Sequence, residues 1–328
     1  MKQQKGLIAK FLEVSSVRTA KRAELSKNTK GAYVSCLRAF HRFLGGKPAT
    51  GWDGADVEGF MRHLAEERFS RSSRKQHLCA LVYAFRHVLG RELGELDLPA
   101  MPKERRPVKV IPTREELRSI FSHLKGMVRT MCGVMYGSGL RVQECCTLRV
   151  KDLDFGALTI RVHEGKGGKD RLCLLPQAMV PALRRQVELR AAMHGQDVAD
   201  GAGWVELPGR LAVKYPAAPR DLRWQFLFPS AVVRSGMRWH ATPAAVQKAL
   251  RLAVGRAGVL KLVTPHTLRH AFCTHALRAG NDAATVQELM GHDSLETTMT
   301  YAHGDHARGV SPLDVGDLVP SRGGAFLA

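Results

Sequence analysis

The chain has 328 residues, of which 45% are hydrophobic, so it can bury ordinary cores and is not a disordered protein. No run approaches the roughly 20 apolar residues of a membrane span, and no membrane partner is expected. Its 50 Lys and Arg against 30 Asp and Glu give a net charge of +20, which is typical of a protein that binds nucleic acid. Seven cysteines without a CxxC pair, and no visible secretory signal, indicate a reducing cytoplasm.

A small helical domain with basic surfaces is expected over residues 1–98. Apolar side chains recur at helical spacing in three stretches, residues 33–44, 57–64 and 78–89. Ser72 or Ser73 is expected to cap the third helix. Each Lys or Arg on the remaining faces has an ordinary explanation as a solvated side chain. Nucleic-acid binding by this domain is therefore predicted from its summed charge and from no single residue.

A basic linker is expected over residues 99–112, because four prolines in this stretch disfavour a helix and four Lys or Arg accompany them. A second domain is expected over residues 113–328. It begins with a capping box, since Thr113 is followed three residues later by Glu116. The sequence Gly137-Ser138-Gly139 then interrupts the helical pattern, which resumes at Arg141.

A β-hairpin is predicted from the alternating apolar residues at 158–162 and the partner segment 171–175. Its turn reads GKGGK, so Lys166 is presented on the hairpin. This turn is not a nucleotide-hydrolysing phosphate loop, because Asp170 stands where Ser or Thr is required and no helix follows.

An unusual insertion occupies residues of about 195–240. It is rich in Gly and Pro, and it contains three of the four tryptophans, Trp204, Trp224 and Trp239. Two interpretations stay open. The aromatic residues form a small satellite core, as large aromatic side chains commonly do, or they form a platform on which unpaired bases stack.

The segment that starts at Thr264-Pro265 carries the strongest chemical signal. Threonine followed by proline predicts a helix start, and the helix carries His266 and Arg269 on one face. His266 and His270 have the spacing of zinc ligands, but neither an HExxH glutamate nor a third ligand accompanies them. No metal is therefore expected.

A metal-free phosphodiester site fits these residue types better. Arginines can bind the non-bridging oxygens of a phosphate with forked hydrogen bonds, and imidazoles can add donors. A tyrosine can attack phosphorus, and a lysine can protonate the departing 5′-oxygen. Each residue alone has an ordinary structural explanation, whereas the set with its spacing favours this chemistry.

Four motifs together resemble the signature of the tyrosine recombinases. They are GSGLR at 137–141, GKGGKDR at 165–171, HTLRH at 266–270, and Gly291-His292 nine residues ahead of Tyr301. The segment Trp204–Ser230 is similar to an insertion of the integron integrases within that family. The resemblance implies a mainly α fold with a small β-hairpin or sheet. A helical DNA-binding domain and a catalytic domain would together form a clamp around DNA.

The resemblance also implies a role for each matching residue. Two arginines would bind the scissile phosphate, a lysine would be the general acid, and two histidines would assist. The set is the nucleophile Tyr301, the phosphate ligands Arg141 and Arg269, the acid Lys166, the histidines His266 and His292, and Glu144, which would orient Arg141.

The predicted function is integration and excision of gene cassettes through a 3′-phosphotyrosyl intermediate, without a cofactor. The partners would be a duplex attachment site, a folded single-stranded site and three further copies of the chain in a tetramer on DNA. Extruded bases would stack on Trp224, Trp239 and His240, and the segment from about 304–328 would dock on a neighbour. The alternatives are a phage-type or chromosome-dimer-resolving recombinase and, in another class, a DNA-binding protein without catalysis.

Overall fold

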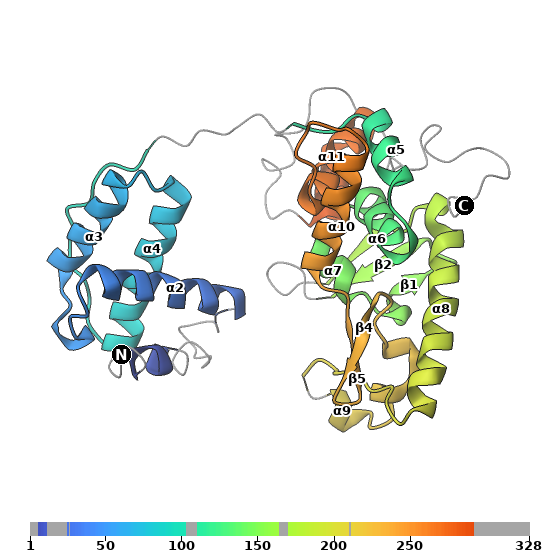
Figure 1. The fold of residues 1–328 in the computed structure, drawn as a ribbon, viewed down its shortest axis with the longest axis horizontal. Coiled ribbons are helices and arrows are strands. Elements are labelled where there is room, and N and C mark those ends of the chain that lie inside the picture. Colours follow the sequence, from blue (N-terminus) through green and yellow to red (C-terminus); the bar gives the residue numbers. More distant parts are fainter. Residues whose placement is uncertain are drawn as a thin grey trace. The chain divides into compact units, whose positions relative to one another are not determined.

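The computed structural model describes residues 6–11, 25, 27–102, 110–163, 170–209 and 211–291. Its contacts divide the chain into two compact units, Met1–Val108 and Lys109–Ala328, which are described separately (Figure 1). Both units are mainly helical, and the second also holds two small sheets, so the expected fold class is confirmed. No helix in the described ranges is long and apolar enough to cross a membrane. All seven cysteines are free thiols.

The first unit is built around a buried tryptophan. Trp52 has no exposed surface, meets the Phe40 ring edge-on at 4.8 Å and donates its Nε1–H to the Lys47 carbonyl. Ser70 caps the third long helix by accepting from the Ser73 amide. The expected cap at residue 72 or 73 was wrong, because the helix begins earlier, directly after the non-helical backbone of Ser70. The elements of the unit are α2 (Lys27–Phe43), η1 (Ala49–Gly51), α3 (Gly54–Glu66), α4 (Arg71–Ala84) and η2 (Phe85–Leu89).

The second unit has a central helix, α6 (Gly126–Ser138), as Figure 1 shows. The C-terminal half of this helix is entirely buried. Helix α11 (Pro265–Arg278) packs along it, and α10 (Pro243–Arg256) contacts both. The predicted caps of the second unit are present: Thr113 forms the capping box with Glu116, and Thr264 caps α11. The remaining helices are α5 (Arg114–Ser122), α7 (Val142–Thr147), α8 (Val180–Ala199) and α12 (Ala283–Met290).

A three-stranded antiparallel sheet lies beside α12. Its strands β1 (Leu153–Asp154), β2 (Thr159–Val162) and β3 (Arg171–Leu174) follow the short helix η3 (Val150–Asp152), with β2 in the middle and Val162 opposite Arg171. The strand expected to start at Leu158 starts one residue later, because Leu158 has φ of 52° and belongs to the preceding turn. The described ends of β2 and β3 bracket the segment that holds Lys166, which lies outside the described residues.

The insertion contains a small core of its own. Val205, Leu207, Ala218 and Phe226 are buried together, with Leu211 and Trp224 against them. The satellite-core interpretation is therefore confirmed for Phe226, whereas Trp204 and Trp239 remain about 40% exposed. The elements of the insertion are α9 (Leu211–Lys214), η5 (Ala218–Arg220), η6 (Leu222–Trp224), β4 (Pro229–Arg234) and β5 (Met237–His240).

Backbone pairing joins the insertion to the chain that follows α7. The Val150 amide donates to the Gln225 carbonyl, and the Leu227 amide donates to the Leu148 carbonyl. Arg149 adds two side-chain bonds, to the Trp224 carbonyl at 2.6 Å and the Glu206 carbonyl at 2.9 Å. The aromatic insertion is thus tied to the segment that leads out of the helix carrying Glu144.

Candidate active site

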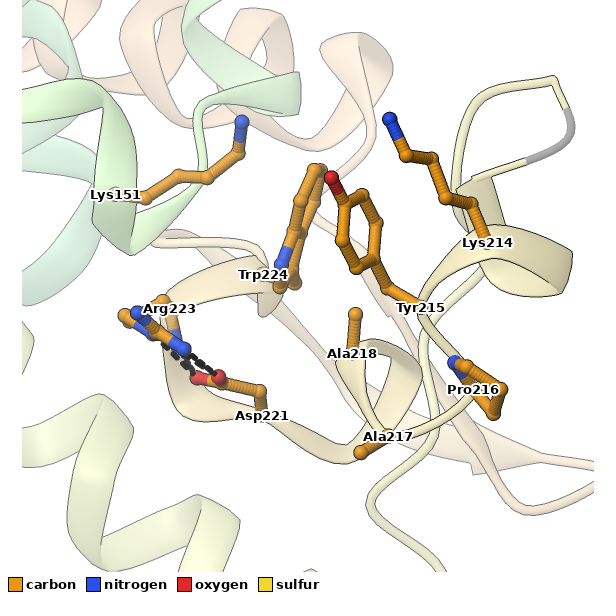
Figure 2. A pocket seen from close by; sticks show the side chains of 9 residues that line it. All are labelled: Lys151, Lys214, Tyr215, Pro216, Ala217, Ala218, Asp221, Arg223 and Trp224. Atoms are coloured by element: carbon orange, nitrogen blue, oxygen red, sulfur yellow. Dashed lines mark hydrogen bonds and ion pairs between the residues drawn. The ribbon is translucent and has the colours of Figure 1, made fainter.

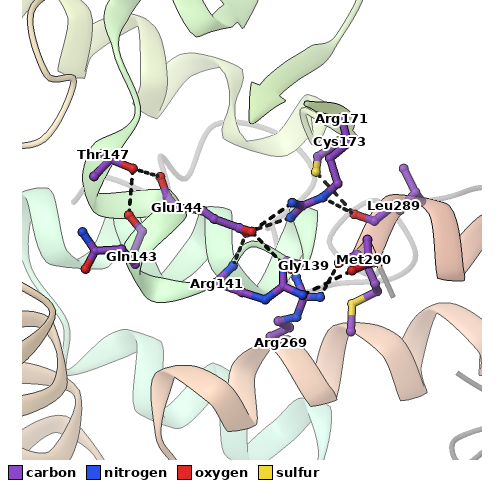
Figure 3. Close-up of polar contacts among 11 residues, drawn as sticks. Gly139, Arg141, Gln143, Glu144, Thr147, Arg171, Cys173, Arg269, Leu289 and Met290 are labelled. Atoms are coloured by element: carbon purple, nitrogen blue, oxygen red, sulfur yellow. Dashed lines mark hydrogen bonds and ion pairs between the residues drawn. The ribbon is translucent and has the colours of Figure 1, made fainter. Parts of the chain in front are cut away.

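One carboxylate organises the predicted phosphate site. Glu144 in the first turn of α7 accepts from Arg141, through its backbone amide at 2.8 Å and its side chain at 2.7 Å (Figure 3). Arg171 approaches from β3 and donates both terminal nitrogens to the same carboxylate, at 2.9 and 2.7 Å. Such forked bonds fix direction as well as distance. Glu144 therefore holds two guanidinium groups in defined orientations.

The electrostatics of the site keep Glu144 ionised. Burial alone would raise the pKa of this carboxyl, but the hydrogen bonds from Arg171 and Arg141 outweigh burial and lower the pKa to about 2. The same bond raises the pKa of Arg171, although burial opposes the shift. The Arg171 guanidinium and the Glu144 carboxylate therefore carry opposite charges at neutral pH.

A third guanidinium, that of Arg269, lies deep in the unit. Only 2% of the residue is exposed, and its terminal nitrogens donate to the carbonyls of Gly139 and Met290. Burial and, to a smaller extent, the neighbouring positive charge of Arg141 lower its pKa to about 10. With one carboxylate among three guanidinium groups, the site carries an excess of positive charge suited to a phosphate.

The C-terminal turn of α12 supplies the carbonyl partners of these arginines. Arg141 donates to the Gly291 carbonyl at 3.2 Å, and Arg171 donates to the Leu289 carbonyl at 3.3 Å. Carbonyls at a helix C-terminus carry partial negative charge and attract cations. The arginines thereby fix the point from which the chain continues to His292.

Two glycines allow this close packing. Gly139 ends α6 with φ of 67°, and a Cβ there would lie 2.6 Å from the Phe272 ring of α11. Gly291 ends α12 with φ of 59°, and a Cβ there would lie 2.9 Å from the Arg171 side chain. The C-terminal glycine predicted for α12, and the Asp282 cap at its start, are both present.

The structure brings together three of the predicted site residues, Arg141, Glu144 and Arg269. His266 lies exposed in the first turn of α11, with its ring 4.1 Å from that of His270. The expectation that His266 and Arg269 share one face was incomplete, since Arg269 is buried while His266 faces solvent. The remaining predicted residues, Lys166, His292 and Tyr301, lie outside the described residues, as does the tail at about 304–328.

Sequence reasoning missed Arg171. Its side chain is only 11% exposed and makes the forked contact with Glu144. Arg171 is, however, the first residue of a short strand, a position at which a charged side chain is usually interpreted as solvated. The available signal was its place at the end of the GKGGKDR motif. Among the described residues, no group of three or more His, Cys, Asp or Glu could hold a metal ion.

The three residues predicted to stack on bases line one cavity of about 570 Å³. Trp224, Trp239 and His240 share it with Lys151 and Arg161, and Glu144 also reaches it. Trp224 borders a second cavity of about 580 Å³ as well, where its ring lies beside Tyr215 (Figure 2). The Lys151 ammonium sits 3.9 Å from the Trp224 ring centroid, a cation–π distance.

Comparison with known families agrees with this geometry. Residues 112–308 match the model of the phage integrase family, and residues 12–95 match the model of the phage integrase N-terminal SAM-like domain. An "Integrase/recombinase" from Escherichia coli is 41% identical over 299 residues, which are 88% of this chain and 89% of the relative. The chain belongs to the phage integrase family. It is a site-specific tyrosine recombinase, an enzyme that cuts and rejoins DNA.

Two further likenesses extend over most of the chain. A tyrosine recombinase XerC from Halalkalibacterium halodurans is 30% identical, with 85% of this chain and 87% of the relative covered. A solved structure of the Tn1549 transposon integrase in complex with transposon right-end DNA has a TM-score of 0.61 at 21% identity, with 92% of this chain and 95% of that chain covered. The latter likeness concerns the fold.

Proposed function

We propose that this recombinase is of the integron type, integrating and excising gene cassettes, and that it accepts a folded single-stranded site as well as a duplex site. The observation that carries the proposal is the cavity lined by Trp224, Trp239 and His240. It belongs to an insertion whose backbone is paired with residues 148–150, next to the arginine site. A base extruded from a folded strand would therefore lie close to the reacting phosphate.

The cavity has the composition that unpaired bases require. Trp239 is 40% exposed, and His240 is braced edge-on against Phe226 at 5.1 Å. Lys151 and Arg161 supply positive charge for the adjoining phosphates. Stacking on an aromatic ring contributes about 1–3 kcal/mol per base, whatever the base, so extruded bases can be held as landmarks without sequence readout.

The proposed chemistry uses the residues of the catalytic set. The Tyr301 oxygen attacks the scissile phosphorus, the bond to the 5′-oxygen breaks, and Lys166 delivers a proton to that oxygen. Arg141 and Arg269 stabilise the charge on the non-bridging oxygens. His266 and His292 hydrogen-bond the phosphate or take up the proton that Tyr301 loses. A 5′-hydroxyl from the partner strand then attacks the phosphotyrosine and releases the tyrosine. The linkage keeps the energy of the phosphodiester, so no cofactor is consumed.

The proposed setting is a tetramer of this chain on DNA in a bacterial cytoplasm. Residues 1–98 would form the helical DNA-binding domain, residues 99–112 a basic linker and residues 113–328 the catalytic domain. The segment at about 304–328, which carries Val310, Leu313 and Leu318, would dock on a neighbouring copy.

The nucleophile is tested with a suicide substrate nicked beside the cleavage point. The wild-type enzyme is expected to form a covalent complex that survives detergent, because the short fragment diffuses away before religation. Tyr301→Phe lacks the attacking oxygen and is expected to form none. A covalent complex that persists in this variant would refute the assignment of the nucleophile.

The integron-type assignment is tested by comparing recombination of folded single-stranded and duplex sites. Trp224→Ala is expected to slow recombination of the folded single-stranded site by about 10-fold or more, because about 1–3 kcal/mol of stacking is lost. Recombination of the duplex site is expected to stay near the wild-type rate. Trp204→Ala is the matched control, since Trp204 lies in the same insertion but lines neither cavity. Equal effects of Trp224→Ala on both sites would favour the alternative, a duplex recombinase of the XerC kind.

A further inference from the structure

His163 lies at the end of β2 and contacts a carboxylate with each of its ring nitrogens. Nε2 is 3.1 Å from Oδ1 of Asp152, and Nδ1 is 2.9 Å from Oδ2 of Asp170. Asp152 ends the short helix η3, whereas Asp170 directly precedes β3. One imidazole therefore joins both ends of the hairpin's turn to the segment that follows α7.

The two contacts require a particular protonation state. A neutral imidazole has one N–H donor and one lone pair, and an ionised carboxylate only accepts hydrogen bonds. A neutral His163 would turn a lone pair towards one of the two carboxylates. Only the imidazolium form can donate to both carboxylates at once.

The surroundings are consistent with a positive charge there. The Asp152 side chain is 3% exposed, and its other oxygen accepts from the Arg149 amide at 2.7 Å. The Lys151 ammonium lies 4.0 Å from Oδ1 of the same carboxylate. A buried carboxylate depends on such partners, so His163 compensates Asp152 more closely than lysine does. The charged and titratable groups lining the shared cavity are Glu144, Arg149, Lys151, Asp152, Arg161, Asp170 and His240.

We propose that His163 is a positioning residue, an imidazolium that ties β2 and β3 to η3 and so sets the placement of the hairpin that carries Lys166. The inference rests on the proposed role of Lys166 as general acid. The same segment, residues 149–152, bonds to the insertion and lies under the Trp224 ring. His163 therefore connects the insertion, through residues 149–152, to the hairpin that carries Lys166.

Two consequences follow for the reaction. Removing the imidazole breaks the contacts that join His163 to Asp152 and Asp170, and misplacement of a reacting group by about 1 Å costs on the order of 100-fold in rate. His163→Ala is therefore expected to slow strand cleavage by about 10- to 100-fold. Arginine also presents charged N–H donors, so His163→Arg is expected to preserve the bridge and most of the cleavage rate.

The test is single-turnover cleavage of a nicked suicide substrate by the full chain. His163→Ala is compared with His163→Arg, which keeps two charged donors and is expected to stay within about threefold of wild type at pH 7. His123→Ala is the control, because His123 is an exposed histidine at the end of α5. A substrate with sulfur in place of the 5′-bridging oxygen provides the decisive readout, since a departing thiolate needs no proton.

His163→Ala is expected to be slow on the oxygen substrate and to recover to nearly the wild-type rate on the sulfur substrate. A rate within twofold of wild type on oxygen would overturn the proposal. So would an equal loss on both substrates without rescue by His163→Arg, because that result describes a merely structural defect. If the wild-type enzyme itself forms no covalent complex, the proposed function fails first, which separates the two failures.

Discussion

Replacing Glu144 by glutamine removes the one negative charge among three arginines while keeping the size of the side chain. The pKa of Glu144 falls from 4.5 to about 2 in the folded chain, because the bonds from Arg171 and Arg141 outweigh burial. At about 1.4 kcal/mol per pH unit, this difference is worth about 3 kcal/mol at neutral pH. The loss agrees with the roughly 3–5 kcal/mol measured when one partner of a buried ion pair is removed.

The sign of the pH dependence follows from the lowered pKa. The stabilisation is fully present above pH 4.5 and is lost as the pH falls towards 2, because the unfolded chain binds the proton first. At pH 3 about 1.4 kcal/mol of it remains. The gap in unfolding free energy between wild type and Glu144→Gln is thus expected to shrink by more than half from pH 7 to pH 3.

Urea unfolding followed by tryptophan fluorescence measures this gap, and three of the four tryptophans, Trp204, Trp224 and Trp239, report on the second unit. Glu188→Gln is the matched control, because Glu188 is exposed on α8. A gap below about 0.5 kcal/mol at pH 7, or an equal gap at both pH values, would refute the reasoning. Strand cleavage by Glu144→Gln is expected to slow by about 10- to 100-fold, since Arg141 loses the carboxylate that orients its guanidinium group.

Three further predictions follow from the second unit and from the charge. Gly139→Ala is expected to lower the free energy of thermal unfolding by about 2–4 kcal/mol, because φ is 67° there and the new Cβ would lie 2.6 Å from Phe272. Gly126→Ala is the control, since Gly126 also has a positive φ but lies in open space, and it is expected to cost about 1–2 kcal/mol. Equal losses in the two variants would contradict this prediction. Burial lowers the pKa of His275 from 6.5 to about 4, so its contribution to the free energy of unfolding is complete above pH 6.5 and falls by about 3 kcal/mol towards pH 4. His275→Gln is therefore expected to reduce the change of the urea midpoint with pH across that range. Parallel curves of midpoint against pH for the variant and the wild type would argue against this prediction. DNA affinity is expected to fall steeply with salt, given the +20 charge, and a flat response in a titration would count against phosphate contacts.

The helix ends were predictable because their signals act within three or four residues. Thr113 with Glu116 and Thr264 with Pro265 satisfy backbone groups of the helix that they start, whatever packs against it later. The Ser70 cap shows the limit of such signals. Serines at 70, 72 and 73 are equally able to cap, and only the backbone turn before α4 selects the first.

The choice of partners within the site was not predictable in the same way. Arg171 and Glu144 are 27 residues apart, and which carboxylate a strand arginine meets depends on how β3 packs beside α6 and α12. Helical spacing placed His266 and Arg269 on one side of α11, yet Arg269 is buried and donates hydrogen bonds to the carbonyls of Gly139 and Met290.

The sequence by itself determined the mainly helical class, the hairpin, and the residue types that suit phosphoryl transfer, because periodicity, capping and turn chemistry are local properties of the chain. Only the tertiary structure decided which arginines Glu144 holds, how deep Arg269 lies, and that His163 stands between two carboxylates. Those contacts join segments far apart along the chain, so they form only when the packed core brings their backbones within reach of a hydrogen bond.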